Sequence, residues 1–139
     1  MIYLAGDHGG FELKEKIKKF LAKNNVEFED LGTTSTQSVS YVEFAKLLCG
    51  KVLENPENKG ILICKSGIGM SIVANRFKGI RAGLCYNIKS AKLSRQHNDC
   101  NVLVLRGKTL FYKKMVKTFL TTPFEGGRHK IRVESIDKD

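Results

Sequence analysis

The chain has 139 residues, of which 42% are hydrophobic and 27% charged, as is typical of a globular protein with a sizeable core. No run of about eighteen uncharged apolar residues occurs, and the beginning MIYLAGDHGG lacks the basic and apolar regions of a signal peptide, so we expect neither a membrane span nor export. The net charge of +10 is concentrated in residues 61–139, which suggests either an anionic partner (a nucleic acid or small phosphorylated molecules) or a solvated lysine-rich surface.

Hydrophobic periodicity predicts strands that alternate with helices along the chain. In chain order we expect a strand at 1–6, a helix at 11–24, a strand at 26–31, a helix at 41–54, a strand at 60–64, a helix at 69–77, a strand at 82–86, a helix capped by Ser90, a strand at 102–105, a helix at 109–121 and a tail with Arg128 and Arg132 on one helical face. This alternation predicts a parallel sheet with helices on both faces. We therefore predict one α/β domain, 1–139: a Rossmann-like three-layer α/β/α sandwich with five parallel strands and a C-terminal helical tail.

The most informative segment is ILICKSGIGMS, residues 61–71. Its apolar run ends in Cys64, and Ser66, Gly67 and Gly69 follow, which predicts a buried strand, a tight turn and the start of a helix. The thiol then lies at the carboxyl edge of the sheet, beside N–H groups that favour negative charge. Cys64 is either a base or nucleophile at a reaction site, or a core cysteine before an ordinary turn.

Other candidate catalytic and binding residues occur near predicted strand ends. Asp7 and His8 follow the first strand at the edge where ligands bind in such folds, although Asp7 could simply cap a helix. His97, in SRQHND, has an ordinary pKa of about 6.5 that suits proton transfer, or it is a solvated loop residue. Arg128 and Arg132 could hold a phosphate, or be solvated tail residues.

The four cysteines are widely spaced and have no CxxC pair and no His ligand pattern near them. We therefore expect no metal site, no disulfide framework and a reducing, cytoplasmic setting.

Together and in order, GDHGGFELK, ILICxSGIGMSIxANRFxGIRA, SRQHNDxNVL and EGGRHxxRV resemble the type B ribose-5-phosphate isomerases and the related galactose-6-phosphate isomerases, over residues 1–136. The resemblance implies a cofactor-independent and metal-independent aldose–ketose isomerase of the pentose phosphate pathway. Its expected reaction interconverts D-ribose 5-phosphate and D-ribulose 5-phosphate through an enediolate. By resemblance, Cys64 is the base that moves the proton between C1 and C2, and His97 opens the sugar ring with Asp7 nearby.

The resemblance also implies the binding residues and the assembly. Donors to the enediolate would come from Ser66 and from the backbone of Gly67, Ile68 and Gly69. Positions that contact the phosphate are matched by His8, Arg128 and Arg132. Positions that contact the sugar are matched by Tyr41 and Asn98. Family members are dimers or dimer pairs with sites shared between subunits. We therefore expect a homodimer or homotetramer in which Cys64 and His97 of different chains can meet.

Three positions depart from the family pattern. Lys65 replaces the usual Gly after the cysteine, and its charge matters only if its side chain points inward. The DYP element reads Ser40-Tyr41-Val42, which leaves the loop shape in question. The GxR element reads Arg106-Gly107-Lys108, so phosphate binding is expected to be weaker than with Arg, unless Arg106 reaches the site from a shifted loop.

Several alternatives remain open from the sequence. The galactose-6-phosphate enzymes divide the cysteine and the histidine between two chains, so a chain with both Cys64 and His97 favours ribose 5-phosphate and a homo-oligomer. A six-carbon substrate such as allose 6-phosphate, or a catalytically weakened sugar-phosphate-binding relative, is also compatible. A nucleic-acid-binding domain lacks a recognisable reader motif, and a thiol-redox protein lacks a nearby resolving cysteine.

Overall fold

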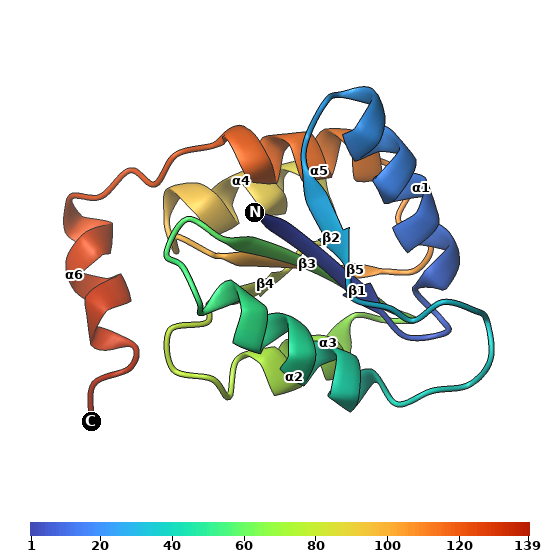
Figure 1. Ribbon diagram of the computed structural model, residues 1–139. Helices are drawn as coiled ribbons and strands as arrows, with labels where there is room; N and C mark the ends of the chain where they lie inside the picture. Colours follow the sequence, from blue (N-terminus) through green and yellow to red (C-terminus); the bar gives the residue numbers. More distant parts are fainter.

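The computed structural model describes residues 1–139, and its strands and helices alternate as the sequence predicts (Figure 1). The strands are β1 (Ile2–Gly6), β2 (Phe28–Asp30), β3 (Lys59–Cys64), β4 (Ala82–Leu84) and β5 (Val102–Arg106). The helices are α1 (Phe11–Lys23), α2 (Tyr41–Val52), α3 (Ile68–Ala74), α4 (Ile88–Gln96), α5 (Tyr112–Thr121) and α6 (Arg128–Ser135). None of these helices has the length and apolar character needed to span a bilayer.

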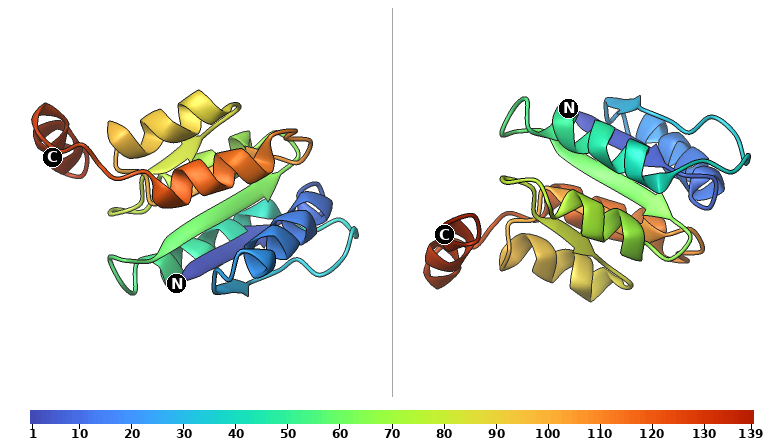
Figure 2. Two further views of the ribbon diagram at one scale, coloured as in Figure 1. Left: turned by 90° about the horizontal axis from the view of Figure 1, so that it is seen from above. Right: turned by 90° about the horizontal axis from the view of Figure 1, so that it is seen from below.

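All five strands are parallel and form one sheet in the order β2-β1-β3-β5-β4. Helices α1, α4 and α5 cover one face, and α2 and α3 cover the other (Figure 2). The central strands are apolar at successive positions because both of their faces are buried. Along β3, for example, Ile61 and Ile63 face the first helix layer, whereas Leu62 and Cys64 face the second. The predicted three-layer parallel fold is therefore confirmed.

Two predicted boundaries are wrong because side chains close local turns. Ser90 is not the cap of α4: Asn87 is, since its Oδ1 accepts a hydrogen bond from Ser90 N at 2.7 Å, and Ser90 Oγ accepts one from Asn87 N at 3.2 Å. The strand predicted to run to residue 86 ends at Leu84. The helix predicted from residue 109 begins at Tyr112, because the hydroxyl and N–H of Thr109 both donate to the Arg106 carbonyl in a turn.

A buried ion pair joins α1 to the end of β2. The Lys14 side chain is fully buried, and its Nζ lies 2.7 Å from Asp30 Oδ2. Lys18 Nζ is also 2.7 Å from this oxygen, and Gly32 N donates to Asp30 Oδ1 at 2.9 Å. Burial alone would raise the pKa of Asp30, but the hydrogen bonds from Lys14, Lys18 and Gly32 outweigh it and hold that pKa below its ordinary value.

We expect Asp30→Asn to lower the free energy of unfolding by about 3 kcal/mol at pH 7, because the buried Lys14 would lose its nearest counter-charge and keep only Glu15, whose Oε1 lies 3.7 Å from Lys14 Nζ. Since the native pKa is depressed, the carboxylate stabilises the fold above about pH 4, its ordinary range, and this contribution is lost as the pH falls through the native pKa. Urea unfolding of both proteins across this range measures the difference, which should shrink toward acid. Glu15→Gln, a half-exposed partner of Lys18, is the control and should cost less than about 1 kcal/mol.

Candidate active site

Cys64 is the last residue of β3, and its thiol lies within the loop that leads to α3. The residue is only 5% exposed, and Gly67 N donates a hydrogen bond to Cys64 Sγ at 3.2 Å. Gly67 has φ 82°, a left-handed conformation that glycine adopts without strain and that turns this N–H back toward the sulfur. Cysteine acts as a base in its thiolate form, and here a backbone N–H is already placed to donate to the sulfur.

The loops that follow β1, β3 and β5 are packed against one another around Cys64. Gly107 N donates to the Cys64 carbonyl at 2.9 Å, and a side chain at Gly107 would lie 2.2 Å from the Gly9 carbonyl oxygen. A side chain at Gly10 would lie 2.1 Å from the Ile63 carbonyl oxygen. Only glycine permits such approaches, so these residues bring three loops to one edge of the sheet.

Asp7, His8 and Tyr41 lie on this same edge. Asp7 is 7% exposed, and its Oδ1 accepts a hydrogen bond from Gly9 N at 2.9 Å, which shapes the loop after β1. His8 Nδ1 accepts from Val39 N at 3.2 Å, so the imidazole joins this loop to the one before α2. The Tyr41 ring covers Gly69, where an added side chain would come within 2.7 Å of it. Asp7 and His8 therefore belong to the edge of the sheet at which Cys64 lies, so within one chain Asp7 is not near His97 as the resemblance implies.

Ser40, which stands where the family pattern has an aspartate, still caps the beginning of α2. Ser40 is the N-cap of this helix, and its Oγ accepts a hydrogen bond from Val42 N at 3.3 Å. Serine and aspartate are interchangeable in this capping role. The loss of the aspartate therefore leaves Tyr41 as the first residue of the helix, next to the Cys64 loop.

Three cationic side chains at the carboxyl edge differ in their contacts. Lys65 and Lys108 are exposed and form no ion pair. Arg106 is the register partner of Cys64 on β5, and its guanidinium lies 5.6 Å from the centre of the Tyr86 ring. Arg106 is therefore held over an aromatic ring, whereas Lys108 is free to meet an anion.

The remaining predicted residues lie elsewhere. His97 caps the C-terminal end of α4, Asn98 follows it, and Arg128 and Arg132 belong to α6. These residues gather where the strands begin, and α6 stands away from the sheet on that side (Figure 1). Asn98, His97 and Arg132 share a cavity of about 370 Å³.

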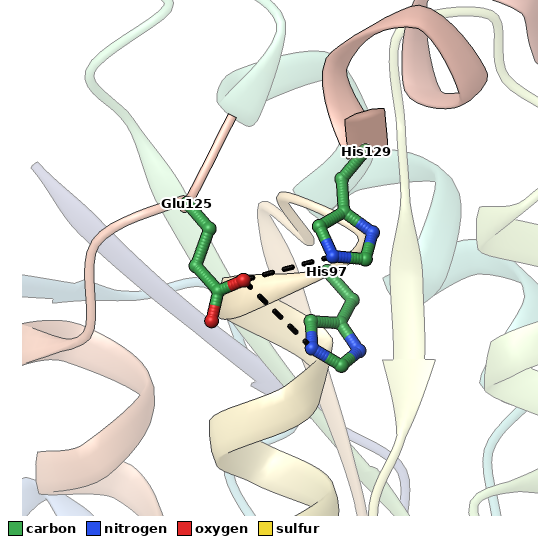
Figure 3. A group of neighbouring side chains, drawn as sticks. All are labelled: His97, Glu125 and His129. Atoms are coloured by element: carbon green, nitrogen blue, oxygen red, sulfur yellow. Dashed lines mark ion pairs between the residues drawn. The ribbon is translucent and has the colours of Figure 1, made fainter. Parts of the chain in front are cut away.

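His97 has two neighbours that the sequence did not reveal. Its ring stacks on His129 with centroids 4.3 Å apart and an angle of 11° between planes. Glu125 Oε2 lies 4.0 Å from His97 Nε2 and 3.6 Å from His129 Nε2 (Figure 3). Packing of His129 against its surroundings, together with the nearby His97 and Arg128, lowers the pKa of His129 below its ordinary value. The four-residue spacing of Glu125 and His129 is the only sequence signal for this pair.

The residues around Cys64 and the residues around His97 are separated by the length of the strands. Five or six residues at about 3.3 Å each place roughly 17–20 Å between the ends of a strand. Cys64 ends β3, whereas His97 lies beside the beginning of β5. Within one chain these two side chains are too far apart to act on the same small molecule.

Comparison with known proteins identifies the group to which this arrangement belongs. The family model described as Ribose/Galactose Isomerase matches residues 2–136. The chain belongs to the ribose/galactose isomerase family. One member, ribose-5-phosphate isomerase B of Escherichia coli, is 44% identical over 133 residues, which cover 94% of this chain and 89% of that protein.

Solved structures of family members have the same fold. A ribose 5-phosphate isomerase from Thermotoga maritima superposes with a TM-score of 0.96 at 48% identity, over 99% of this chain and 97% of that one. A ribose-5-phosphate isomerase B from Mycoplasma genitalium with bound ribulose-5-phosphate has a TM-score of 0.92 at 38% identity, over 97% and 92% of the two chains.

Proposed function

We propose that this protein interconverts D-ribose 5-phosphate and D-ribulose 5-phosphate at a site assembled from two protomers. The observation that carries the proposal is the Gly67 N–H on Cys64 Sγ, in a loop where three strand ends converge. Family membership and the relative that binds ribulose-5-phosphate support the substrate class. Because Cys64 and His97 both occur in this chain, a homo-oligomer contains every group that the reaction needs.

Cys64 is the base for the isomerisation step. Its thiolate takes the proton from C2 of the open-chain aldose, which leaves an enediolate, and returns it to C1 of the ketose, while the hydroxyl proton passes from O2 to O1. The negative charge that develops on oxygen needs donors already in place. Ser66 and the N–H groups through Gly69 belong to the turn that follows Cys64 and suit this role; Gly67 N donates to the sulfur and Ile68 N donates to Ser66 Oγ.

His97 serves ring opening from the second protomer. Because an imidazole can act both as an acid and as a base, His97 can take the anomeric hydroxyl proton and deliver one to the ring oxygen. In a dimer whose two-fold axis reverses the strand direction, the His97 edge of one protomer meets the Cys64 edge of the other. By symmetry this contact occurs twice, so the dimer has two equivalent sites. Exposed Ile68 and Ile72 lie one turn apart on α3, which follows the Cys64 loop, and such an apolar face suits coverage by a second copy.

The substrate phosphate is held by groups from both protomers. His8 and Lys108 lie at the Cys64 edge, and Arg128 and Arg132 come from the α6 of the second protomer. An exposed α6 with no buried residue is well placed to reach a neighbouring chain. The direct test is turnover of D-ribose 5-phosphate by the purified protein, followed by the absorbance of ribulose 5-phosphate; no turnover of this sugar would exclude the proposal.

We expect Lys108→Arg to lower KM for ribose 5-phosphate about threefold to tenfold with little change in kcat. Lys108 is exposed and free of ion pairs, and an arginine there can form two parallel bonds to a phosphate where lysine offers a point charge. Steady-state kinetics measures the effect, with Lys117→Arg on the far side of α5 as the control. An unchanged KM would mean that position 108 does not contact the phosphate.

A further inference from the structure

The structure has a polar cavity at the edge of the sheet opposite the Cys64 loop. It encloses about 400 Å³ between the segment after α2, the beginning of β3, the turn before β4 and the end of α4. Only two of its eleven lining residues are hydrophobic, and none of the eleven lines the cavity beside His97. None of the residues that line this amino-edge cavity is among those proposed for the isomerase reaction, although His97 and Arg132 lie at the same edge of the sheet.

Positive charge predominates in this cavity. Lys59, Arg81 and Arg95 line it together with a single carboxylate, that of Asp99. Arg95 Nη1 lies 2.9 Å from Asp99 Oδ1, and Arg81 Nη2 lies 3.2 Å from Asp99 Oδ2. One carboxylate is therefore shared by two arginines. Asp99 therefore pairs with one nitrogen of each guanidinium, and it forms no ion pair with Lys59.

Lys59 Nζ has no hydrogen-bond partner and no ion-pair partner, although the residue is half-buried. Burial lowers the pKa of Lys59, and the positive charge of Arg95 lowers it further. Arg95 is itself 8% exposed, yet its Nη2 bonds to no protein atom, and Arg81 Nη1 is also unpaired. Since no fully buried side-chain nitrogen lacks a partner, these unpaired nitrogens have accessible surface, and all three residues line the cavity.

We propose that the amino-edge cavity is a second binding site, which takes the phosphate group of a small phosphorylated polyol between Lys59, Arg81 and Arg95. A dianion would add negative charge beside Lys59, Arg81 and Arg95, whose three positive charges face Asp99 and the nearby Glu57, and it would accept the free N–H donors. Asparagine side chains on the same walls, including Asn55, whose Nδ2 is unpaired, suit hydroxyl groups. The volume is within the range of small-ligand sites and exceeds what a phosphate ion alone would fill.

The test follows the side-chain NMR signals of Lys59 and Arg95 during titration with glycerol 3-phosphate, inorganic phosphate and glycerol. We expect saturable shifts of both signals with glycerol 3-phosphate, weaker binding of inorganic phosphate and no response to glycerol. Lys59→Gln should weaken binding at Arg95 at least about tenfold, the effect of about 1.4 kcal/mol. This variant should still fold, because the Lys59 side chain forms no bond in the protein.

The matched control is Lys117→Gln, which removes the same charge from an exposed lysine without an ion pair. It should leave the titration unchanged. Unsaturable shifts, or equal losses in the two variants, would reduce the effect to general screening and overturn the proposal. Equal or tighter binding of inorganic phosphate would overturn the assignment to a phosphorylated polyol. Lys59 is not among the residues proposed for the isomerase site, so its signal distinguishes ligand in this cavity from ligand in the site that includes His97.

Discussion

Cys64→Ala is expected to lower kcat/KM for ribose 5-phosphate by about 10²- to 10⁴-fold, the usual contribution of a positioned acid–base group. The methyl group of alanine cannot take a proton from carbon, while the backbone donors of the Cys64 loop stay in place. The substrate should therefore still bind, which calorimetry with ribulose 5-phosphate can measure in the absence of turnover. Thermal unfolding should show a protein that remains folded.

Cys49→Ala is the matched control for this experiment. Cys49 is fully buried in α2, and burial raises the pKa of its thiol to about 12, so it is never a thiolate near neutrality. This variant should keep nearly full turnover, even if it is somewhat less stable. Activity of Cys64→Ala within a few-fold of the wild type would remove Cys64 from the reaction and leave it as a core cysteine.

Mixing two inactive variants is expected to restore activity. Each dimer has two sites, and each site takes Cys64 from one protomer and His97 from the other. In a dimer of either variant, Cys64→Ala or His97→Asn, both sites therefore lack one of the two residues. In a mixed dimer, one site combines both lesions and the other has neither. Random exchange of subunits makes about half of the dimers mixed, each with one intact site, so activity should return to about a quarter of the wild-type value.

The measurement is turnover of ribose 5-phosphate after the two variants are unfolded together and refolded in equal amounts. Each variant refolded alone gives the background, and wild type treated identically gives the full scale. A second control mixes Cys64→Ala with Cys64→Ser, which cannot complement one another. No recovery in the first mixture, with good recovery of wild type, would show that the site does not combine these residues of two chains.

Much of the fold follows from local patterns. The apolar runs before Gly6, Cys64 and Arg106 become the central strands because a parallel sheet buries both faces of each strand. The helices that flank them have apolar residues at helical spacing, as in α1, where Leu13, Ile17 and Leu21 are buried. Boundaries were harder to predict, because they depend on which side chain closes a turn, as Asn87 and Thr109 do.

The candidate site was only partly predictable. The step from β3 through Cys64 to glycine could be located from residue order, and the structure adds the N–H of Gly67 on the sulfur. Stacking of His97 on His129 was not foreseen, since the two residues are 32 positions apart and only the path of the chain after α5 brings them together. The same is true of Lys14 and Asp30, whose pairing depends on how α1 packs over β2.

The sequence by itself determined the alternation of strands and helices, the strand end that carries Cys64, and the helical spacing of Arg128 and Arg132. These features depend on periodicity and on neighbouring residues, which a single chain displays directly. Only the tertiary structure decided that Cys64 and His97 lie at opposite edges of the sheet, and that Lys59, Arg81 and Arg95 meet in one cavity. Such relations follow from strand order and packing between elements distant in the chain, because contacts across a sheet are set by which strands are neighbours.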